Sequence, residues 1–417
     1  MTAAAGVRVR FAPSPTGSLH LGNALTAVAN RRFADDHGGV LVLRIDDTDA
    51  ARDVEGGEDG ILRDLAWLGV GVDEGPVRQS ARGEIYRAAA ERLVAASAAT
   101  REGDGSVRTA ARLAGASSSH RPTLLRPDGT ATYHLASVAD DVDLRITHVI
   151  RGADHRSNAD LHLALLAALG VAAPEILHHG LILGEDGSKL SKRDAAASGS
   201  GGVAAPGGGA AAGSRQGAAA AADLVSIADF RAAGIPAEAV RAYLVELGLP
   251  RHDVRLDLAR VRRLAVEALA AMSDEDLAAR VGAPVRLAAA LRGARDFAEA
   301  ADYAESILRP DLGSGPGGGP GGGPGGGPAE TPPAARPTLL RFAELRAGAA
   351  DELDDETARS IVRELKAVHA DLKALRRALT GRERGPELWA VVRALARAEA
   401  LARVDFSPGA APDAPSG

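Results

Sequence analysis

The sequence predicts an α/β protein in which a Rossmann-like parallel sheet is followed by α-helical C-terminal domains. Over the first 194 residues, short apolar runs typical of strands alternate with segments of helical periodicity. Strands and helices that alternate in this way form parallel sheets, because each helix carries the chain back to the start of the next strand. Beyond two low-complexity segments, residues 227–308 and 338–405 have helical periodicity, the latter over two or three amphipathic helices.

The elements of the α/β part follow from the spacing of apolar residues along the chain. Strands are predicted at 7–12, 40–45, 130–139, 144–151 and 176–183. Helices are predicted at 19–36, 54–69, 81–97 and 157–169. A turn over residues 13–17, stiffened by two prolines, separates the first strand from the first helix. Residues 98–121 are small and polar, and we expect them to interrupt the fold.

Two segments of low complexity divide the chain. Residues 195–222 are almost all Ala, Gly and Ser, and residues 313–328 repeat Gly-Gly-Gly-Pro every four residues, which is not the period of three that collagen requires. Both compositions are typical of flexible connectors. The predicted parts are 1–194 (α/β, with a short insert at 97–121), 195–222 (linker), 223–310 (helical), 311–336 (Gly/Pro linker), 337–405 (helical) and 406–417 (disordered tail).

The composition limits the classes of function. The net charge of −6 excludes a generic polyanion binder, so any contact with nucleic acid must come from a local basic face. The absence of cysteine excludes disulfides, thiolate zinc sites and cysteine nucleophiles. Because no apolar run reaches 18 residues and the N-terminus lacks a long apolar stretch, we expect a soluble, cytoplasmic protein without a membrane partner. We expect it to be a monomer.

Lysine is rare in this chain, and two of the few lysines lie in one short segment. Of 49 basic residues four are lysines, namely Lys189, Lys192, Lys366 and Lys373. Two of them lie three residues apart in the segment 187–193. A lysine ammonium is a mobile point charge suited to phosphate, whereas arginine offers a rigid planar fork. The segment is therefore predicted to be a phosphate-handling loop.

The start of the first helix is a candidate partner for this loop. His20 and the backbone donors around it lie where the helix begins, and helix N-termini attract anions through their unpaired N–H groups. Gly22 has no side chain, so a flat ring or a ribose can approach the backbone. A bare His-x-Gly is more often a capped helix with an incidental histidine. The preceding strand and Pro-rich turn, together with the lysine segment, favour the phosphate site.

Five blocks of the sequence resemble those of the glutamyl-tRNA synthetases. They are FAPSPTGSLHLGN, LRIDDTD, TYHLASVADD, THVIRGADHRSN and LILGEDGSKLSKR. Within them, His20-Leu21-Gly22-Asn23 is similar to the family's HIGH motif and Lys189–Arg193 to its KMSKS motif. The resemblance covers residues 7–96 and 122–194 well and the two helical regions more loosely. Either motif alone has low specificity, whereas the five blocks in this order are highly specific.

The resemblance implies an ATP-dependent ligase. In this family ATP and glutamate form glutamyl-adenylate and pyrophosphate, and the glutamyl group then passes to the terminal adenosine of tRNA. The substrate carboxylate is the nucleophile, so catalysis is positioning and charge stabilisation. The implied catalytic residues are His20 and Lys192. The implied ATP-binding residues are His20, Gly22, Asn23, Lys189, Ser191, Lys192 and Arg193. Mg²⁺ is expected to arrive with the nucleotide, without zinc or a protein-built metal site.

The resemblance also implies a pocket for L-glutamate. Its residues would be Arg10, Ala12, Ser14, Asp46, Tyr133 and Arg151. A dicarboxylic amino acid needs cations for two carboxylates and an anion for its ammonium, which Asp46 would supply. Taken singly, Arg10 and Arg151 are more simply explained as surface arginines, and Tyr133 is equally well explained as a core residue. His178 and His179 are interpreted as structural, and His148 and His155 have no convincing ligand partners for a metal.

A basic segment near the end of the chain is the candidate contact for tRNA. Residues 359–403 carry eleven Lys or Arg against five Asp or Glu, an excess of six positive charges. A solvated charged helix face explains this equally well, but the segment resembles the family's anticodon-binding region. The candidate residues are Lys373, Arg376, Arg377, Arg382 and Arg384, and the expected partner is tRNA-Glu. Trp389 is expected in the core.

Four departures from the family pattern leave alternatives open. Residues 97–121 stand in place of a sizeable acceptor-stem domain, Asp46 stands where glutamate is usual, Ala153 replaces an acidic residue, and the Ala/Gly tract follows the lysine loop directly. The alternatives are a paralogue that activates glutamate for another acceptor, such as a modified tRNA base or a carrier, and a non-catalytic ATP or glutamate sensor. A generic nucleotidylyltransferase would not explain the glutamate-pocket blocks.

Overall fold

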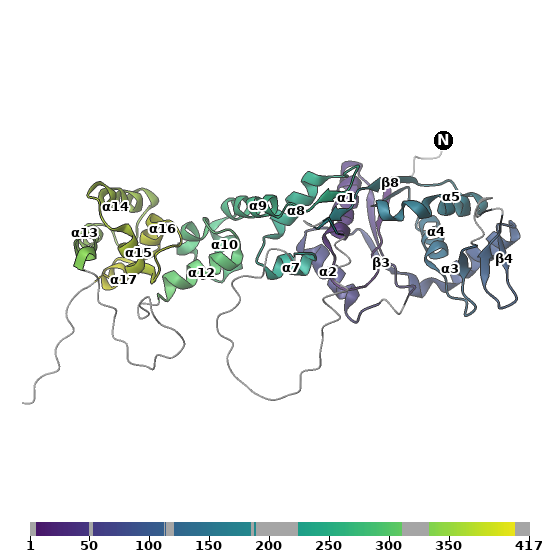
Figure 1. Cartoon of the computed structure of the whole chain (residues 1–417), viewed down its shortest axis with the longest axis horizontal. Helices are drawn as coiled ribbons and strands as arrows, with labels where there is room; N and C mark the ends of the chain where they lie inside the picture. Colours follow the sequence, from purple (N-terminus) through teal and green to yellow (C-terminus); the bar gives the residue numbers. More distant parts are fainter. Residues whose placement is uncertain are drawn as a thin grey trace, which may run out of the picture. The chain divides into compact units, whose positions relative to one another are not determined.

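The computed structural model describes residues 6–49, 53–111, 113, 121–184, 187–188, 224–310 and 333–404 (Figure 1). The chain divides into two compact units. The first comprises Met1–Ala233 with Ala237–Val261, and the second comprises Gly234–Pro236 with Arg262–Gly417.

Parallel strands form the centre of the first unit, in one sheet of three strands and one of two. They are β1 (Arg8–Phe11), β2 (Val40–Ile45), β3 (Glu74–Arg78), β7 (His148–Gly152) and β8 (Glu175–His179). β1, β2 and β3 pair in parallel in that order, and β7 pairs in parallel with β8. The backbone N–H of Thr147 donates to the carbonyl of Arg8 over 2.9 Å, so β7 begins beside β1. The predicted Rossmann-like α/β class is confirmed.

The helices of the first unit pack through apolar residues spaced three or four apart. α1 buries Leu21, Ala24, Leu25 and Val28, which lie on one face of the helix. The helices are α1 (Leu21–Asp36), α2 (Gly57–Trp67), α3 (Gly83–Ala95), α4 (Tyr133–Asp143), α5 (Ala159–Ala168), α7 (Ile227–Ala232) and α8 (Ala237–Leu247), with the 3₁₀ turns η1 (Gln79–Arg82) and η2 (Ala153–Asn158). The helices α1, α2, α3 and α5 begin within three residues of their predicted starts.

The strand predicted at residues 130–139 is wrong, because Tyr133–Asp143 form the helix α4. All residues of Leu135–Asp141 are buried. A helix that is buried on nearly every side has no polar face, so its 3.6-residue period does not show in the sequence. A short apolar run of this kind cannot be distinguished from a buried strand by periodicity alone.

Part of the segment expected to interrupt the fold is itself folded. β4 (Ala99–Arg101), β5 (Val107–Thr109) and β6 (Thr123–Leu125) form a small antiparallel sheet. Val107 and Leu124 are fully buried and belong to one core cluster with residues of α3, α4 and α5. Residues 114–120 lie outside the described residues. Described residues of the short segment 97–121 therefore contribute to the core of the first unit.

The chain beyond residue 223 returns to the first unit before it enters the second. Leu21 N donates to Val225 O over 3.0 Å, and Ile227 N donates to Leu19 O over 2.8 Å. β9 (Ile182–Leu183) pairs in parallel with β10 (Val254–Arg255). The boundary between the two units therefore falls inside the predicted helical domain 223–310. These hydrogen bonds join the first part of that domain to the start of α1 and to β9. The predicted linker 195–222 lies outside the described residues.

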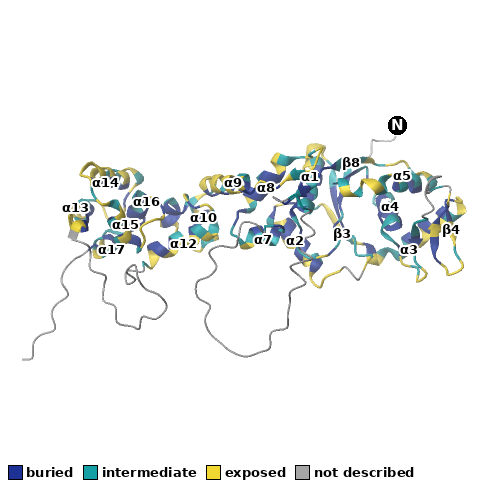
Figure 2. Ribbon diagram, in the orientation of Figure 1, coloured by how far each residue is buried: buried dark blue, intermediate teal, exposed yellow. Residues whose placement is uncertain are grey.

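The second unit is helical and has a single core. Its helices are the end of α9 (Leu258–Ala271), α10 (Asp274–Val281), α11 (Ala288–Leu291), α12 (Phe297–Leu308), α13 (Arg336–Ala347), α14 (Asp355–Ala367), α15 (Leu372–Thr380), α16 (Leu388–Ala394) and α17 (Arg397–Ala402), with the 3₁₀ turns η4 (Val285–Leu287) and η5 (Pro333–Ala335). One buried cluster runs from Leu269 to Val404 (dark blue in Figure 2). Residues on both sides of the segment 311–332 thus share one core.

Candidate active site

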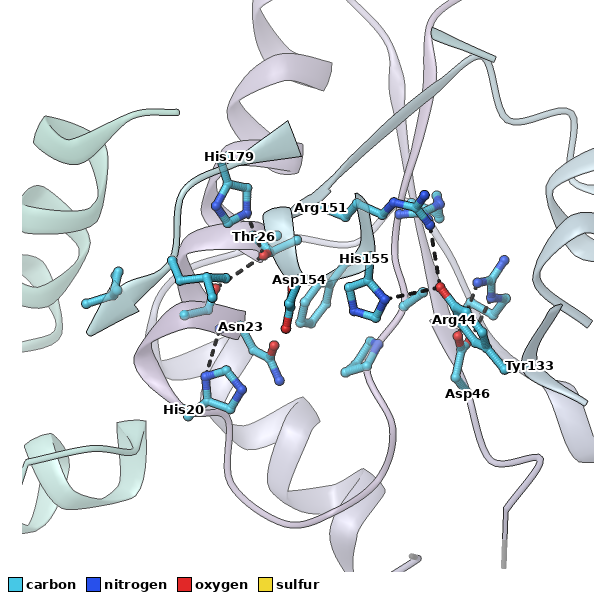
Figure 3. A pocket seen from close by; sticks show the side chains of 18 residues that line it. His20, Asn23, Thr26, Arg44, Asp46, Tyr133, Arg151, Asp154, His155 and His179 are labelled. Atoms are coloured by element: carbon cyan, nitrogen blue, oxygen red, sulfur yellow. Dashed lines mark hydrogen bonds and ion pairs between the residues drawn. The ribbon is translucent and has the colours of Figure 1, made fainter. Parts of the chain in front are cut away.

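A cavity of about 150 Å³ lies at the carboxyl ends of β1, β2, β7 and β8 (Figure 3). In a parallel sheet these ends meet at one edge, which brings together residues far apart in the sequence. The predicted residues that line it are Arg10, Ala12, His20, Gly22, Asn23, Asp46, Tyr133 and Arg151. Ser14 is not among the lining residues. The predicted Lys189, Ser191, Lys192 and Arg193 lie outside the described residues.

His20 is the N-cap of α1, and its ring is held in one tautomer. The backbone N–H of Asn23 donates to His20 Nδ1 over 3.2 Å. Because Nδ1 accepts, the proton of the neutral ring is on Nε2, which is then a donor. A Cβ on Gly22 would lie 3.2 Å from His20 Cε1 and Nδ1. A side chain at position 22 would therefore press on the imidazole of His20. Glycine at this position thus leaves room for the ring as well as giving a ligand access to the backbone.

A buried carboxylate anchors the turn before His20. Asp64 of α2 is fully buried and accepts from Ser18 Oγ over 2.6 Å and from the Leu19 N–H over 2.8 Å. Arg231 of α7 lies 3.2 Å from its other oxygen. Ser18 Oγ in turn accepts from the N–H of Ala228 over 3.1 Å. Asp64 therefore joins the His20 turn to α7.

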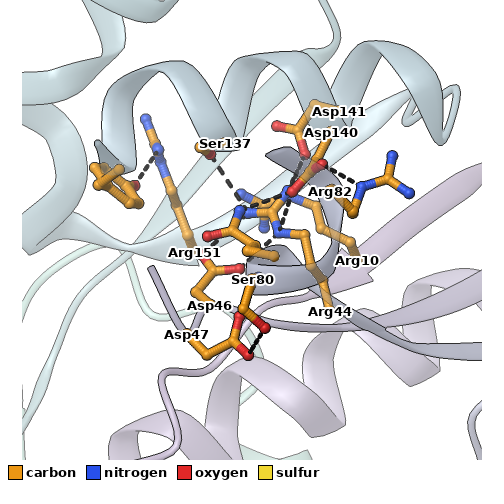
Figure 4. Close-up of polar contacts among 12 residues, drawn as sticks. Arg10, Arg44, Asp46, Asp47, Ser80, Arg82, Ser137, Asp140, Asp141 and Arg151 are labelled. Atoms are coloured by element: carbon orange, nitrogen blue, oxygen red, sulfur yellow. Dashed lines mark hydrogen bonds and ion pairs between the residues drawn. The ribbon is translucent and has the colours of Figure 1, made fainter. Parts of the chain in front are cut away.

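A buried ion network forms the floor of the site (Figure 4). Arg44 is 1% exposed and pairs with Asp46 over 2.7 Å and Asp141 over 2.8 Å, with Asp140 at 3.7 Å. Burial alone would lower the pKa of Arg44, but the ion pairs with Asp46 and Asp141 outweigh it and hold the pKa well above its ordinary value. Arg44 is therefore a permanent, internally compensated cation.

Asp46 lines the cavity but already has a partner. Its two oxygens accept from Arg44 Nε over 2.7 Å and Nη2 over 3.2 Å. Burial raises the pKa of Asp46 even though Arg44 opposes this shift. A substrate ammonium bound here would share the Asp46 carboxylate with Arg44. This pairing was not evident from the sequence.

Arg10 and Arg151 both line the cavity, and each has a buried nitrogen without a hydrogen-bond partner among the described residues. Arg10 is 4% exposed, and its Nε lies 3.4 Å from Asp141 Oδ1 without hydrogen-bond geometry. Arg151 is 5% exposed, and its Nη2 is buried without a hydrogen-bond partner among the described residues. A buried donor without an acceptor costs about 1–3 kcal/mol. Two such guanidiniums around one cavity favour an anionic ligand.

The structure adds lining residues that sequence reasoning missed, namely Thr26, Arg44, Asp154, His155 and His179. His179, interpreted as structural, lies with its Nε2 3.0 Å from Thr26 Oγ1. Asp154 follows the position where an acidic residue was noted as missing, at Ala153. The unusual Ala153 could have drawn attention to Asp154, because the carboxylate of Asp154 lines the same cavity.

The candidate tRNA residues of the second unit differ in their surroundings. Arg376 donates to the carbonyl of Pro386, Arg377 pairs with Glu383, and Arg382 pairs with Asp302. Lys373 and Arg384 are exposed.

Trp389 packs half-buried against the core, with the guanidinium of Arg359 3.9 Å from its ring centroid. Its ring therefore contributes to packing, as expected.

No group of three or more His, Cys, Asp or Glu side chains within the described part of the chain is arranged to hold a metal ion. No helix in the described ranges is both long and apolar enough to cross a bilayer.

Comparison with known proteins adds independent findings. Residues 6–104 and 104–204 match the family model of the catalytic domain of class I tRNA synthetases (E and Q). The chain is 48% identical over 211 residues to glutamate–tRNA ligase 1 of Rubrobacter xylanophilus, covering 47% of this chain and 49% of the relative. It is 39% identical over 249 residues to glutamate–tRNA ligase 2 of Koribacter versatilis, covering 46% and 52%. The matches thus span about half the length of these relatives.

A solved structure resembles the chain over a longer range. The crystal structure of a glutamate tRNA ligase from Elizabethkingia meningosepticum in complex with its amino acid superposes with a TM-score of 0.68 at 21% identity, covering 96% of this chain and 98% of that one. This likeness supports the fold. The resemblance that the five sequence blocks predicted is confirmed by the family and sequence matches.

Proposed function

On the premise that residues 6–204 belong to the catalytic-domain family of class I glutamate and glutamine tRNA synthetases, we propose that this protein is a glutamate–tRNA ligase. The observation that carries the proposal is the pair of buried guanidiniums, Arg10 and Arg151, with unsatisfied donors beside the N-terminus of α1. The cavity between them suits a small dicarboxylate, and the helix N-terminus suits a phosphate.

In the proposed reaction, ATP and L-glutamate form glutamyl-adenylate. The carboxylate of glutamate attacks the α-phosphate, and pyrophosphate leaves. His20 Nε2 donates to phosphate oxygens, and Gly22 and Asn23 admit the nucleotide against the start of α1. Lys192, with Lys189, Ser191 and Arg193, neutralises the leaving pyrophosphate. Mg²⁺ accompanies the nucleotide phosphates.

Glutamate binding is proposed to use the two guanidiniums together. Arg10 holds one carboxylate and Arg151 gives the second positive charge, with the Tyr133 hydroxyl beside it. Ala12 and Ser14 belong to the turn at this end of β1, and Asp46 accepts the ammonium in competition with Arg44. The substrate's net negative charge then matches a pocket in which Arg44 is compensated, Arg10 is partly compensated by Asp141, and Arg151 has neutral hydrogen-bond partners.

In the second step, the glutamyl group passes to the terminal adenosine of tRNA, with tRNA-Glu as the proposed acceptor. Contact with its backbone is proposed for the basic segment of the second unit, above all for the exposed Lys373 and Arg384. Replacing either should raise the Michaelis constant for tRNA and reduce the salt dependence of binding. We further propose that the protein acts as a monomer in the cytoplasm.

The test is pyrophosphate exchange with glutamate, with and without tRNA, followed by charging of tRNA. Lys192→Ala should lose most of the exchange, because the leaving pyrophosphate keeps its charge uncompensated. Arg63→Ala, which removes an exposed cation of α2, is the matched control and should retain full exchange. Exchange without charging would favour transfer to another acceptor. No exchange by folded protein in either condition would favour a sensor.

A further inference from the structure

The strand pair β7–β8 places His178 directly beside Arg151. In the parallel register Arg151 is the partner of His178. The Nε–H of Arg151 donates to His178 Nε2 over 3.3 Å. Side chains alternate along a strand, so the neighbouring His179 points to the other face, where its ring lies against Thr26. The two adjacent histidines therefore have different environments, and one of them contacts a pocket cation.

Arg151 is oriented by two neutral groups. Its Nε donates to His178, and its Nη1 lies 3.5 Å from the Tyr133 hydroxyl. Two contacts fix the plane of a guanidinium, whose donors form a rigid fork. The remaining Nη2 is the buried donor that has no acceptor among the described residues. The plane set by His178 and Tyr133 thus determines where this donor points.

A neutral acceptor orients Arg151 without cancelling its charge. Arg44 shows the contrasting case, since three aspartates surround it. A carboxylate beside Arg151 would orient the guanidinium equally well but would compensate its charge before a ligand arrives. An imidazole that accepts through Nε2 leaves that charge available to a substrate carboxylate.

The surroundings of His178 keep the imidazole neutral. Burial, followed by the positive charges of Arg151 and Arg156 and by His155 and His179, lowers the pKa of His178. These groups come from β7, from η2 and from β8 itself. The lone pair on Nε2 is therefore available to Arg151 at neutral pH, with the ring proton on Nδ1.

We propose that His178 is a positioning residue for substrate selection, which holds Arg151 in the orientation that receives a substrate carboxylate while leaving its positive charge uncompensated. This inference rests on the proposed glutamate activation. It assigns to His178 the preference for a dicarboxylic amino acid over its amide, because only a carboxylate benefits from the uncompensated charge.

Steady-state exchange kinetics of three His178 variants test the proposal. His178→Phe keeps a flat ring but removes the acceptor, so the Michaelis constant for glutamate should rise on the order of tenfold or more, with that for ATP unchanged. His178→Gln places an amide oxygen near the position of Nε2 and should restore the wild-type value. His178→Glu should orient Arg151 but compensate its charge, so glutamate should lose its advantage over glutamine.

His148→Phe is the matched control. His148 lies at the other end of the same strand pair, 3.4 Å from Glu175, and should leave the Michaelis constant for glutamate unchanged. An unchanged constant in His178→Phe would overturn the proposal. So would a Gln variant as impaired as the Phe variant, because the role would then be steric.

A spectroscopic measurement keeps the inference independent of activity. In ¹⁵N NMR of the full chain, His178 should be neutral at pH 7 with its proton on Nδ1, and Arg151→Ala should change the Nε2 signal. An Nε2–H tautomer in the wild-type protein would overturn the assignment. The wild-type protein could have the neutral Nδ1–H tautomer of His178 but no glutamate-dependent exchange. The proposed function would then be refuted, whereas the hydrogen bond from Arg151 to His178 would be supported.

Discussion

Three arginines meet at the cavity, and their partners give them different effects on a ligand. Arg44 is surrounded by aspartates and presents little net charge. Arg10 lies 3.4 Å from Asp141, which it shares with Arg44. Arg151 has neutral neighbours in His178 and Tyr133. The positive field that a substrate meets therefore comes mainly from Arg151 and in part from Arg10.

The buried side chain of His162 should make the free energy of unfolding depend on pH. Burial, followed by the charge of Arg151 and by His134, lowers the pKa of His162 to about 3. The unfolded chain binds a proton near pH 6.5, whereas the folded protein does not until about pH 3. Stability should therefore fall as the pH drops through this window, by roughly a few kcal/mol from His162.

The measurement is urea unfolding of the wild type and His162→Leu at pH 7.5 and 4.5. The variant should lose less stability than the wild type between these two pH values, because it cannot take up the proton in the unfolded state. Leu165→Ala, from the same helix, is the packing control and should be destabilised equally at both. Parallel losses in the wild type and His162→Leu would contradict the shifted pKa.

At the residue scale, the sequence predicted Arg10, Asp46 and Arg151 as charged residues of the cavity but missed Arg44 and Asp154. Tyr133 and Arg151 were identified because they stand inside recognisable blocks, and Arg10 because it directly precedes the first block. The pairing of Asp46 with Arg44 was not foreseen, since an ion pair between neighbouring side chains depends on how α4 closes the floor with Asp141. The lysine loop stays a prediction.

At the scale of elements, Asp64 joins three segments at one buried point. Its carboxylate on α2 accepts from Ser18 and Leu19 before α1 and lies beside Arg231 of α7. The His20 turn and the first segment after the predicted linker are therefore fixed to a common anchor. The position of His20 depends on a residue that does not line the cavity.

Asp64→Ala should destabilise the first unit by about 2–4 kcal/mol, because the buried Leu19 N–H and the partly buried Ser18 hydroxyl lose a charged acceptor. The measurement is the unfolding transition in denaturant. Asp59→Ala removes an exposed carboxylate from the same helix and should change stability by less than about 0.5 kcal/mol. Equal effects of the two substitutions would show that the anchor contributes nothing.

α1 lies close to its expected position because its buried apolar residues recur at helical spacing among polar residues. β2 is buried on both faces and was recognised instead as a short continuous apolar run. α4 was mistaken for a strand since the seven consecutive residues Leu135–Asp141 are all buried. The strands β4 to β6 are three residues each, too short for alternation to be recognised.

For the molecule as a whole, each unit contains one tryptophan, Trp67 in the first and Trp389 in the second. The predicted division at residues 223 and 311–336 differs from these units, because long-range packing is not visible in local periodicity. The two tryptophans nevertheless make each unit separately observable by fluorescence.

Arg346→Ala should lower the stability of the second unit alone. Arg346 is fully buried and donates to the carbonyls of Ala350 over 2.6 Å and Leu395 over 3.1 Å. Its loss leaves buried acceptors and a cavity, at a cost of about 2–4 kcal/mol. In a Trp67→Phe background the Trp389 transition should shift, whereas in a Trp389→Phe background the Trp67 transition should not.

Arg341→Ala removes an exposed arginine from the same helix and is the control, with little shift expected in either background. A Trp67 transition that moved together with that of Trp389 would contradict the independence of the two units.

The core of the second unit also has a consequence for synthesis on the ribosome. α11 packs against α16, and the buried cluster extends to Val404. The sheet and its flanking helices can close once residue 261 has left the exit tunnel, whereas α10 to α12 must wait for the final helices before their apolar faces are covered. Nascent chains stalled between residues 310 and 388 should therefore expose this surface to chaperones and proteases.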